Sequence, residues 1–423
     1  MSLRILLFVL LCTATAFQQA DRTPPSSFTV LKKLIREKNF FAARAAYGKQ
    51  SAGFTAFQKH YAEAFLDGAF NRLEPSTRHI DHLLKGNYPQ LKDSDRVHLL
   101  QLQQANWGKL YEYAKAASVL RQLLNQYPRL LTQEERDDAR NTLLIWTALA
   151  GVPRQTVTIS ETARLPIHRD RAGLPNLSVQ AADTTFDFVF DTGANLSTIT
   201  TSTAKRLGVQ LLADSIQVGS ITGQTVEARL GHCSSLQLGP IKVQDVVFLV
   251  LPDSALAFPQ VGYQIHGILG FPVIEAFKEV TITRTDTLLV PQKQTLAKEQ
   301  NLAIDFLTLI LNIDGEAYTF DSGATTTLLY QNYFSKYKKQ IQSRYREEAL
   351  PIGGAGGGTS SRGYKVSFQP RIGDRKIRLD SVYLFPQPRK VEDRYYYGNI
   401  GQDLIRHFHS VTLNFSSMFI RFD

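Results

Sequence analysis

Two aspartates occupy nearly the same surroundings in two distant parts of the chain. Residues 188–194 read FVFDTGA and residues 318–324 read YTFDSGA, so an apolar run leads into Asp191 and into Asp321. Two carboxyl groups held close together cannot both ionise readily, and such a pair shares a proton. The ionised member can act as general base on a bound water while the protonated member donates to a carbonyl oxygen. The paired motifs therefore predict hydrolysis by an activated water, with no covalent intermediate, metal or cofactor.

The residues that follow each aspartate fit this chemistry. Gly193 and Gly323 allow tight turns at points where a side chain would collide with the facing loop. The hydroxyl groups of Thr192 and Ser322 can hydrogen-bond across to the other loop and fix both loops. A single Asp-Thr/Ser-Gly tripeptide more often marks an ordinary turn, so the prediction depends on the presence of two copies.

Further matching segments follow each aspartate at the same distance. Residues 267–277 read GILGFPVIEAF and residues 398–408 read GNIGQDLIRHF, and after them VTI at 280–282 matches VTL at 411–413. The glycine that ends GILG lies 79 residues after the first aspartate, and the glycine that ends GNIG lies 80 residues after the second. Because chance does not keep motifs in register over such a distance, the sequence predicts a duplicated unit that supplies one carboxylate per copy.

The elements that must position these motifs differ between two parts of the chain. Before residue 153 apolar residues recur at helical spacing, as in the run from Leu110 to Pro128, and Thr132 with Glu135 forms a capping box for a helix that ends at 150. From residue 154 onward, short β-branched and aromatic runs alternate with Gly, Pro and Asp turns. Strands are predicted at 157–159, 186–190, 243–251 and 411–415. The predicted fold class is an N-terminal all-α domain of helical hairpins at 17–153, followed by a duplicated all-β double lobe at 154–284 and 302–423, with a linker at 285–301.

On these motifs, the stretch from about residue 156 to 423 resembles the pepsin and retropepsin superfamily of aspartic peptidases, and in particular its bacterial retropepsin-like, two-lobed members. The family's apolar-apolar-Gly element, which packs behind each catalytic loop, corresponds to residues 268–270 and 399–401, where Asn399 departs from the pattern. The resemblance implies an aspartic endopeptidase with Asp191 and Asp321 as its catalytic residues. The N-terminal stretch is similar to tetratricopeptide arrays, although a plain all-helical domain explains its pattern nearly as well.

The resemblance also implies a β-hairpin flap that closes over substrate. The candidates in the two copies are Ser220, Ile221, Thr222 and Gly223, and Gly353 and Gly354. The second group belongs to a glycine run that a plain flexible loop would also explain. Ala194 and Ala324 stand where pepsin-type members have Ser or Thr, whose hydroxyl favours the ionised carboxylate. We therefore expect activity at mildly acidic to near-neutral pH.

The N-terminus and the composition set the expected compartment and partners. Residues 1–16 predict a signal peptide, because Arg4 precedes a short apolar run and residues 14–16 read ATA. That run is too short to span a membrane, so we expect export to the periplasm or the exterior without stable membrane insertion. Cys233 is then left without a disulfide partner and should be buried. The net charge of +10 is scattered along helix faces without interleaved aromatics, so no nucleic-acid partner is expected, and the histidines show no metal-binding motif.

These features lead to one main hypothesis and one rival. The main hypothesis is an exported aspartic endopeptidase that works as a monomer on peptide or protein substrates, with helices that recruit substrate or a partner protein. The rival is an exported binding or scaffold protein in which the helices do the work and the protease-like lobes are inert. Because both aspartates keep their glycine and hydroxyl neighbours, the sequence favours the enzyme.

Overall fold

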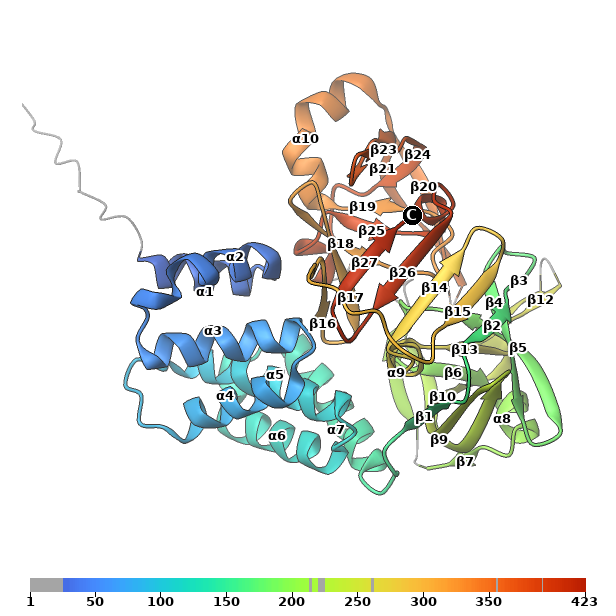
Figure 1. Cartoon of the computed structure of the whole chain (residues 1–423), viewed down its shortest axis with the longest axis horizontal. Coiled ribbons are helices and arrows are strands. Elements are labelled where there is room, and N and C mark those ends of the chain that lie inside the picture. The colour runs from blue at the N-terminus through green and yellow to red at the C-terminus, as the bar shows by residue number, and fades with distance from the viewer. Residues whose placement is uncertain (1–25, 213–214, 220–224, 260–261, 355–356, 390) are drawn as a thin grey trace, which may run out of the picture.

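The computed structural model describes residues 26–212, 215–219, 225–259, 262–354, 357–389 and 391–423. It comprises a helical region, a first β region (residues 156–290) and a second β region (residues 302–422). In Figure 1 the helices lie on the left, the second β region at the top and the first β region at the lower right. The predicted signal peptide and the flap candidates Ser220, Ile221, Thr222 and Gly223 lie outside the described residues. Within the described part, no helix is both long and apolar enough to cross a membrane.

The helical region consists of antiparallel helix pairs (Figure 1). Helices α1 to α7 span, in order, Ser27–Arg36, Phe40–Gln50, Ala56–Ala69, Leu73–Lys85, Asp93–Lys109, Tyr113–Gln126 and Gln133–Leu149. Lys38, Asn71 and Tyr111 have positive φ and make the tight turns between α1 and α2, α3 and α4, and α5 and α6. The capping box at the start of α7 is confirmed, since Thr132 and Glu135 exchange both hydrogen bonds. The helical run predicted from Leu110 is wrong at its start, because the left-handed turn at Tyr111 ends one helix before the next begins.

A ten-stranded sheet forms most of the first β region. Its order is β1-β10-β6-β13-β5-β4-β9-β7, with β3 beside β4 and β8 beside β9. The strands are β1 Thr156–Ile159, β3 His168–Arg169, β4 Pro175–Ala181, β5 Thr184–Phe190, β6 Ser197–Thr200, β7 Gln210–Leu211, β8 Ile216–Gly219, β9 Thr225–Leu238, β10 Ile241–Leu251 and β13 Gly267–Leu269. Because β9 also pairs with β10, the sheet closes on itself. The short elements α8 Thr201–Arg206, β11 Ala257–Phe258, β12 Tyr263–Gln264 and α9 Phe271–Ala276 complete the region.

An eight-stranded sheet forms most of the second β region, in the order β16-β17-β18-β25-β19-β24-β21-β20. The strands are β16 Leu302–Asp305, β17 Thr308–Ile313, β18 Glu316–Phe320, β19 Leu328–Leu329, β20 Glu347–Gly354, β21 Gly357–Phe368, β24 Leu379–Leu384 and β25 Gly398–Ile400. Helix α10 Gln331–Arg344, the hairpin β22 Arg371–Ile372 and β23 Arg375–Lys376, and helix α11 Gln402–Ile405 lie between or after these strands. The two β regions share one feature. In each, the strand that leads into an aspartate pairs in parallel with the strand that leads into a glycine: β5 pairs with β13, and β18 pairs with β25.

A third sheet joins the two β regions. This joint sheet has the order β2-β15-β14-β26-β27, with β2 at Ala163–Pro166, β15 at Thr287–Val290, β14 at Glu279–Thr283, β26 at Ser410–Asn414 and β27 at Phe419–Phe422. Strands β14 and β26 are antiparallel, and Thr281 faces Thr412 with 2.8 Å between their hydroxyl oxygens. The linker predicted at 285–301 is thus too long at its start, because Leu288 and Val290 are buried on β15.

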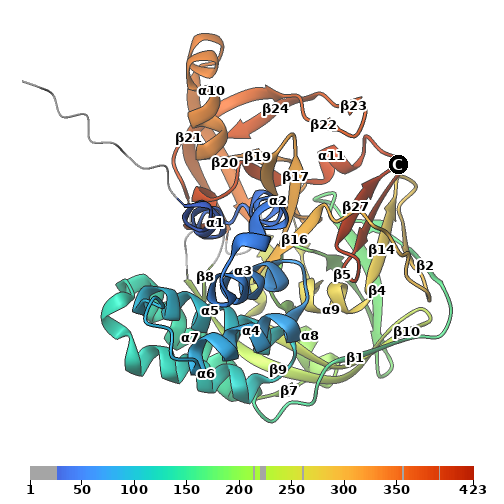
Figure 2. The ribbon, with the colours of Figure 1, turned by 60° about the vertical axis from the view of Figure 1, so that its left-hand side comes forward.

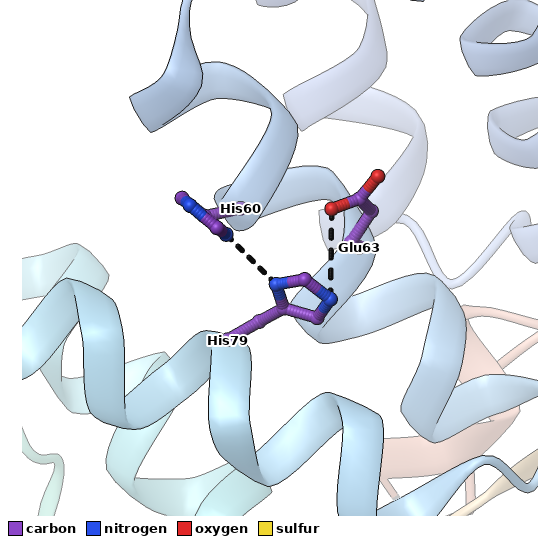
Figure 3. A group of neighbouring side chains, drawn as sticks. All are labelled: His60, Glu63 and His79. Atoms are coloured by element: carbon purple, nitrogen blue, oxygen red, sulfur yellow. Dashed lines mark hydrogen bonds and ion pairs between the residues drawn. The ribbon is translucent and has the colours of Figure 1, made fainter.

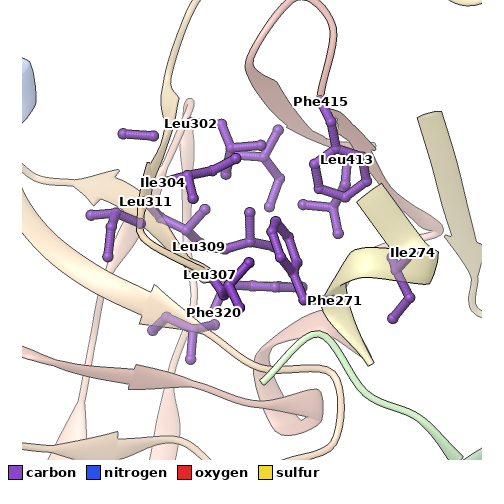
Figure 4. Packing of buried hydrophobic residues seen from close by; sticks show 14 of the residues in the cluster. Phe271, Ile274, Leu302, Ile304, Leu307, Leu309, Leu311, Phe320, Leu413 and Phe415 are labelled. Carbon is purple, nitrogen blue, oxygen red and sulfur yellow. The ribbon is translucent and has the colours of Figure 1, made fainter. Parts of the chain in front are cut away.

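A continuous hydrophobic core connects the three parts. Phe271 of α9 lies beside Leu309 of β17, as Figure 4 shows, and it belongs to the same buried cluster as Ile274 of α9 and Leu413 of β26. The rings of Phe271 and Phe415 meet edge to face, with centroids 5.8 Å apart. The helical region packs against this core (Figure 2), and the buried Lys109 ammonium group lies 3.1 Å from Glu275 of α9. Cys233 is buried and free, as predicted.

Candidate active site

Two parallel strand pairs hold the aspartates at corresponding points of the two β regions. Asp191 follows β5, and its backbone N–H donates to Leu269 O at 3.1 Å. Asp321 follows β18, and its backbone N–H donates to Ile400 O at 3.0 Å. Each aspartate is thereby fixed at the tip of a buried strand and stays partly accessible.

The two aspartate loops face each other at very short range. A Cβ atom added to Gly193 would lie 2.5 Å from Cγ of Asp321, and one added to Gly323 would lie 2.3 Å from Cγ of Asp191. Since real Cβ atoms essentially never approach other heavy atoms closer than 3.0 Å, only glycine fits at either position. The structure therefore brings Asp191 and Asp321 together, each over the glycine of the opposite loop.

Buried hydroxyl groups cross-link the loops. The Thr192 backbone N–H donates to Ser322 Oγ at 3.0 Å, and the Ser322 backbone N–H donates to Thr192 Oγ1 at 2.9 Å. Ser322 Oγ in turn donates to Phe190 O at 2.9 Å. Every one of these groups is shielded from water, so the bonds also satisfy donors and acceptors that would otherwise be buried unpaired.

Backbone amides bind one oxygen of each carboxyl group. Gly193 N–H donates to Asp191 Oδ1 at 2.8 Å. In the second loop both Gly323 and Ala324 donate to Asp321 Oδ1, at 2.8 and 3.1 Å. Burial, followed by the charge of Asp321, raises the pKa of Asp191 well above the ordinary value, while the amides of Gly193 and Ala194 oppose this shift. The pair can therefore hold one proton at pH values where an isolated carboxyl group has lost it.

The glycines behind the loops pack as the apolar-apolar-Gly element implies. A Cβ atom on Gly270 would lie 2.6 Å from the backbone carbon of Leu196, and one on Gly401 would lie 2.7 Å from that of Thr326. The residue after each glycine donates its N–H to the last residue of the motif, over 2.8 Å to Ala194 O and 2.9 Å to Ala324 O. Both loops are supported from behind in the same way.

Two polar side chains of the second loop were not predicted as site residues. Asn399 accepts a hydrogen bond from Thr319 Oγ1 at 2.6 Å, and its amide nitrogen lies 3.4 Å from Asp321 Oδ2. Gln402 donates to Ser322 O at 2.9 Å. In the sequence, Asn399 was noted only as a departure from an apolar pattern. A polar residue at a position expected to be apolar was the signal that could have identified it as a site residue.

Paired strands contain the second flap candidate and flank the first. In the second β region β20 pairs with β21, and Gly353 and Gly354 face Gly358 and Gly357. In the first β region, β8 lies before the predicted flap residues and β9 after them. These two strands pair from Ile216 opposite Ala228 to Gly219 opposite Thr225.

The family model described as Aspartyl protease matches residues 177–273, from β4 through Asp191 to α9. A structure search finds the crystal structure of a retropepsin-like aspartic protease from Rickettsia conorii, with 21% sequence identity, 33% of this chain and 94% of that chain covered, and a TM-score of 0.23. A TM-score this low supports no argument by itself, so the assignment depends on the family match. A search of curated proteins finds no match. The resemblance to the aspartic peptidases is confirmed, and residues 177–273 of the first β region are the part that matches the family model.

Proposed function

We propose that this protein is an aspartic endopeptidase in which Asp191 and Asp321 form one catalytic pair. The observation that carries the proposal is the reciprocal contact of each carboxyl group with the glycine of the opposite loop. An inert scaffold has no need to place two carboxyl groups together at partly accessible strand tips, because their mutual repulsion costs stability.

The two β regions are, on this proposal, two copies of one unit, and residues 302–422 supply the half that the family match does not reach. The matching triplets VTI and VTL support this. They lie opposite each other on β14 and β26, with Val280 facing Leu413 and Ile282 facing Val411 about the central threonine pair. Such self-complementary pairing is typical of a local twofold axis.

The hydrogen bonds suggest which carboxyl group does what. Backbone amides reach both carboxyl groups, but among the described residues only Asp321 has a side-chain amide, that of Asn399, near its other oxygen, so we assign Asp321 the role of general base. Asp191, with its raised pKa, is suited to hold the proton. A water between them loses a proton to Asp321 as its oxygen attacks the peptide carbon, while Asp191 protonates the carbonyl oxygen. Asp321 then gives its proton to the amide nitrogen, and the C–N bond breaks as a hydroxyl of the tetrahedral diol returns its proton to Asp191, so the pair again holds one proton.

We further propose that substrate binds as an extended peptide under the β8–β9 and β20–β21 hairpins, since hairpin edges can pair with an added strand. One chain contains both aspartates, so the enzyme is expected to act as a monomer. Export through residues 1–16 and recruitment of substrate or a partner by the helices complete the proposal.

The direct test is digestion of a peptide library by the purified protein between pH 3 and 8, with and without pepstatin, followed by mass spectrometry. We expect internal cleavage that pepstatin abolishes, with an activity per molecule that does not change on dilution. Absence of cleavage across this range would favour the inert scaffold, and a steep loss on dilution would indicate a site shared between chains.

A further inference from the structure

Two consecutive helices of the helical region place imidazole and carboxylate groups side by side. His60 and Glu63 lie one turn apart on α3, and His79 lies across from them on α4 (Figure 3). The Nδ1 atoms of His60 and His79 are 2.8 Å apart, and His79 Nε2 lies 3.5 Å from Glu63 Oε2. One ligand atom from each residue can be chosen so that all three lie within 4.8 Å of one another.

We propose that His60, Glu63 and His79 bind a divalent transition-metal ion, with zinc as the preferred ion. Ligand atoms about 2.0–2.1 Å from a tetrahedral zinc ion lie roughly 3.3 Å from one another, so the Glu63 carboxylate, which now lies nearest Nε2 of His79, would rotate toward Nδ1 to complete the set. Two imidazoles and one carboxylate suit zinc, whereas calcium and magnesium prefer oxygen ligands throughout. Three protein ligands leave a fourth position for water or for a ligand from a partner.

The surrounding residues are arranged to hold these ligands. Tyr47 donates its hydroxyl to Glu63 Oε1 at 2.6 Å, which fixes the carboxylate. The buried Asp67 carboxylate lies 3.7 Å from Nε2 of His79 and is paired with Arg72. When Nδ1 of His79 binds a metal, its Nε2–H can donate to Asp67, the usual support for a metal-bound imidazole.

The contact between the two imidazoles marks the place where an ion would bind. With no metal, the two Nδ1 atoms can approach to 2.8 Å only when one of them carries a proton. A bound ion would replace that proton and link α3 to α4. The sequence pattern did not predict this site because its ligands come from two helices and match no single-segment motif.

The test is a zinc titration of the full chain after chelator treatment, followed by competition with a chromophoric chelator and by thermal unfolding. We expect one tight site per chain and a higher Tm with zinc. His79→Gln and His60→Gln should each weaken binding on the order of 100-fold, and Asp67→Asn on the order of 10-fold. Cobalt should give the intense visible absorption of a tetrahedral site, and His79→Gln should abolish it.

Two controls keep the outcome clear. His168→Gln alters an exposed histidine of β3 and should leave binding unchanged. The double variant His407→Gln/His409→Gln removes two exposed histidines near the C-terminus and should also retain the tight site. Circular dichroism without zinc checks that each variant folds. Equal zinc affinity in wild type and in a folded His79→Gln variant, or loss of binding in the His407/His409 variant, would refute the proposal.

Discussion

The two aspartate loops share a backbone and differ in the side chains around it. In both, the aspartate N–H donates to a carbonyl of the strand before the glycine, and the carbonyl of the loop alanine accepts from the residue after the glycine. Behind Asp191, however, the corresponding position holds Ile268, whereas behind Asp321 it holds Asn399. The Asn399 amide beside Asp321 therefore has no counterpart beside Asp191. The difference teaches that similar backbone contacts can bring two carboxyl groups together while the side chains around them differ.

A second difference lies in how each loop is anchored. After Gly270 the chain continues with Phe271, which is packed in the core, whereas after Gly401 it continues with Gln402. The Gln402 side chain accepts from Arg169 of the first β region, which is itself paired with Asp286 at 2.7 Å. The second loop is therefore tied to the opposite region by polar contacts, and the first mainly by apolar packing.

The largest expected effect comes from removal of either carboxyl group. Asp191→Asn and Asp321→Asn should each lower kcat for peptide cleavage by roughly a thousandfold or more, since each leaves the pair without its acid or its base. Asp187→Asn, an exposed change on the same strand as Asp191, is the matched control and should retain activity. Near wild-type turnover in either loop variant would show that the carboxyl groups do not work as a pair.

The next effect is on the free energy of unfolding, and it differs between the hydroxyl groups of Ser322 and Thr192. Ser322→Ala should cost roughly twice as much unfolding free energy as Thr192→Val. It leaves two buried groups unpaired, Thr192 N–H and Phe190 O, whereas Thr192→Val leaves only the Ser322 N–H. Each unpaired group costs about 1–3 kcal/mol. Urea denaturation measures the difference, with the exposed Ser178→Ala as control. Equal losses would mean that the bond to Phe190 contributes nothing.

The duplicated motifs made this geometry largely predictable, and the rest required the fold. Close approach of the glycines at 193 and 323 to the facing loop could be expected, because a side chain at either position would collide with that loop. The hydrogen bond of Asn399 could not be expected, because it depends on the parallel pairing of β25 with β18, which places residue 399 beside Thr319. The predicted start of one helix was wrong for the same reason. The helical spacing of apolar residues continues across Tyr111, although the left-handed turn at that residue ends one helix and precedes the next.

A smaller effect tests the asymmetry directly. In Asn399→Ile the second loop acquires the residue type of the first, and the amide near Asp321 Oδ2 is lost. Because that donor favours the ionised carboxylate, the acidic limb of the kcat/KM profile should move to higher pH by about half a unit to one unit. The reciprocal Ile268→Asn variant should leave the acidic limb in place. An unchanged acidic limb in folded Asn399→Ile would assign Asn399 a purely structural role.

The smallest effect concerns Ala194, which offers no hydroxyl to Asp191. In Ala194→Ser a new hydroxyl can donate to the outer oxygen of that carboxylate, and such a bond favours the ionised form and opposes the burial that raises the pKa of Asp191. In the proposed mechanism activity requires a protonated Asp191, so it should be lost as pH rises through this pKa. The variant should therefore lose activity at lower pH than the wild type, with the basic limb displaced by about half a unit. Ala324→Thr acts on the proposed base and should leave the basic limb in place. A basic limb that moves equally in both variants, or in neither, would show that the shared proton does not reside mainly on Asp191.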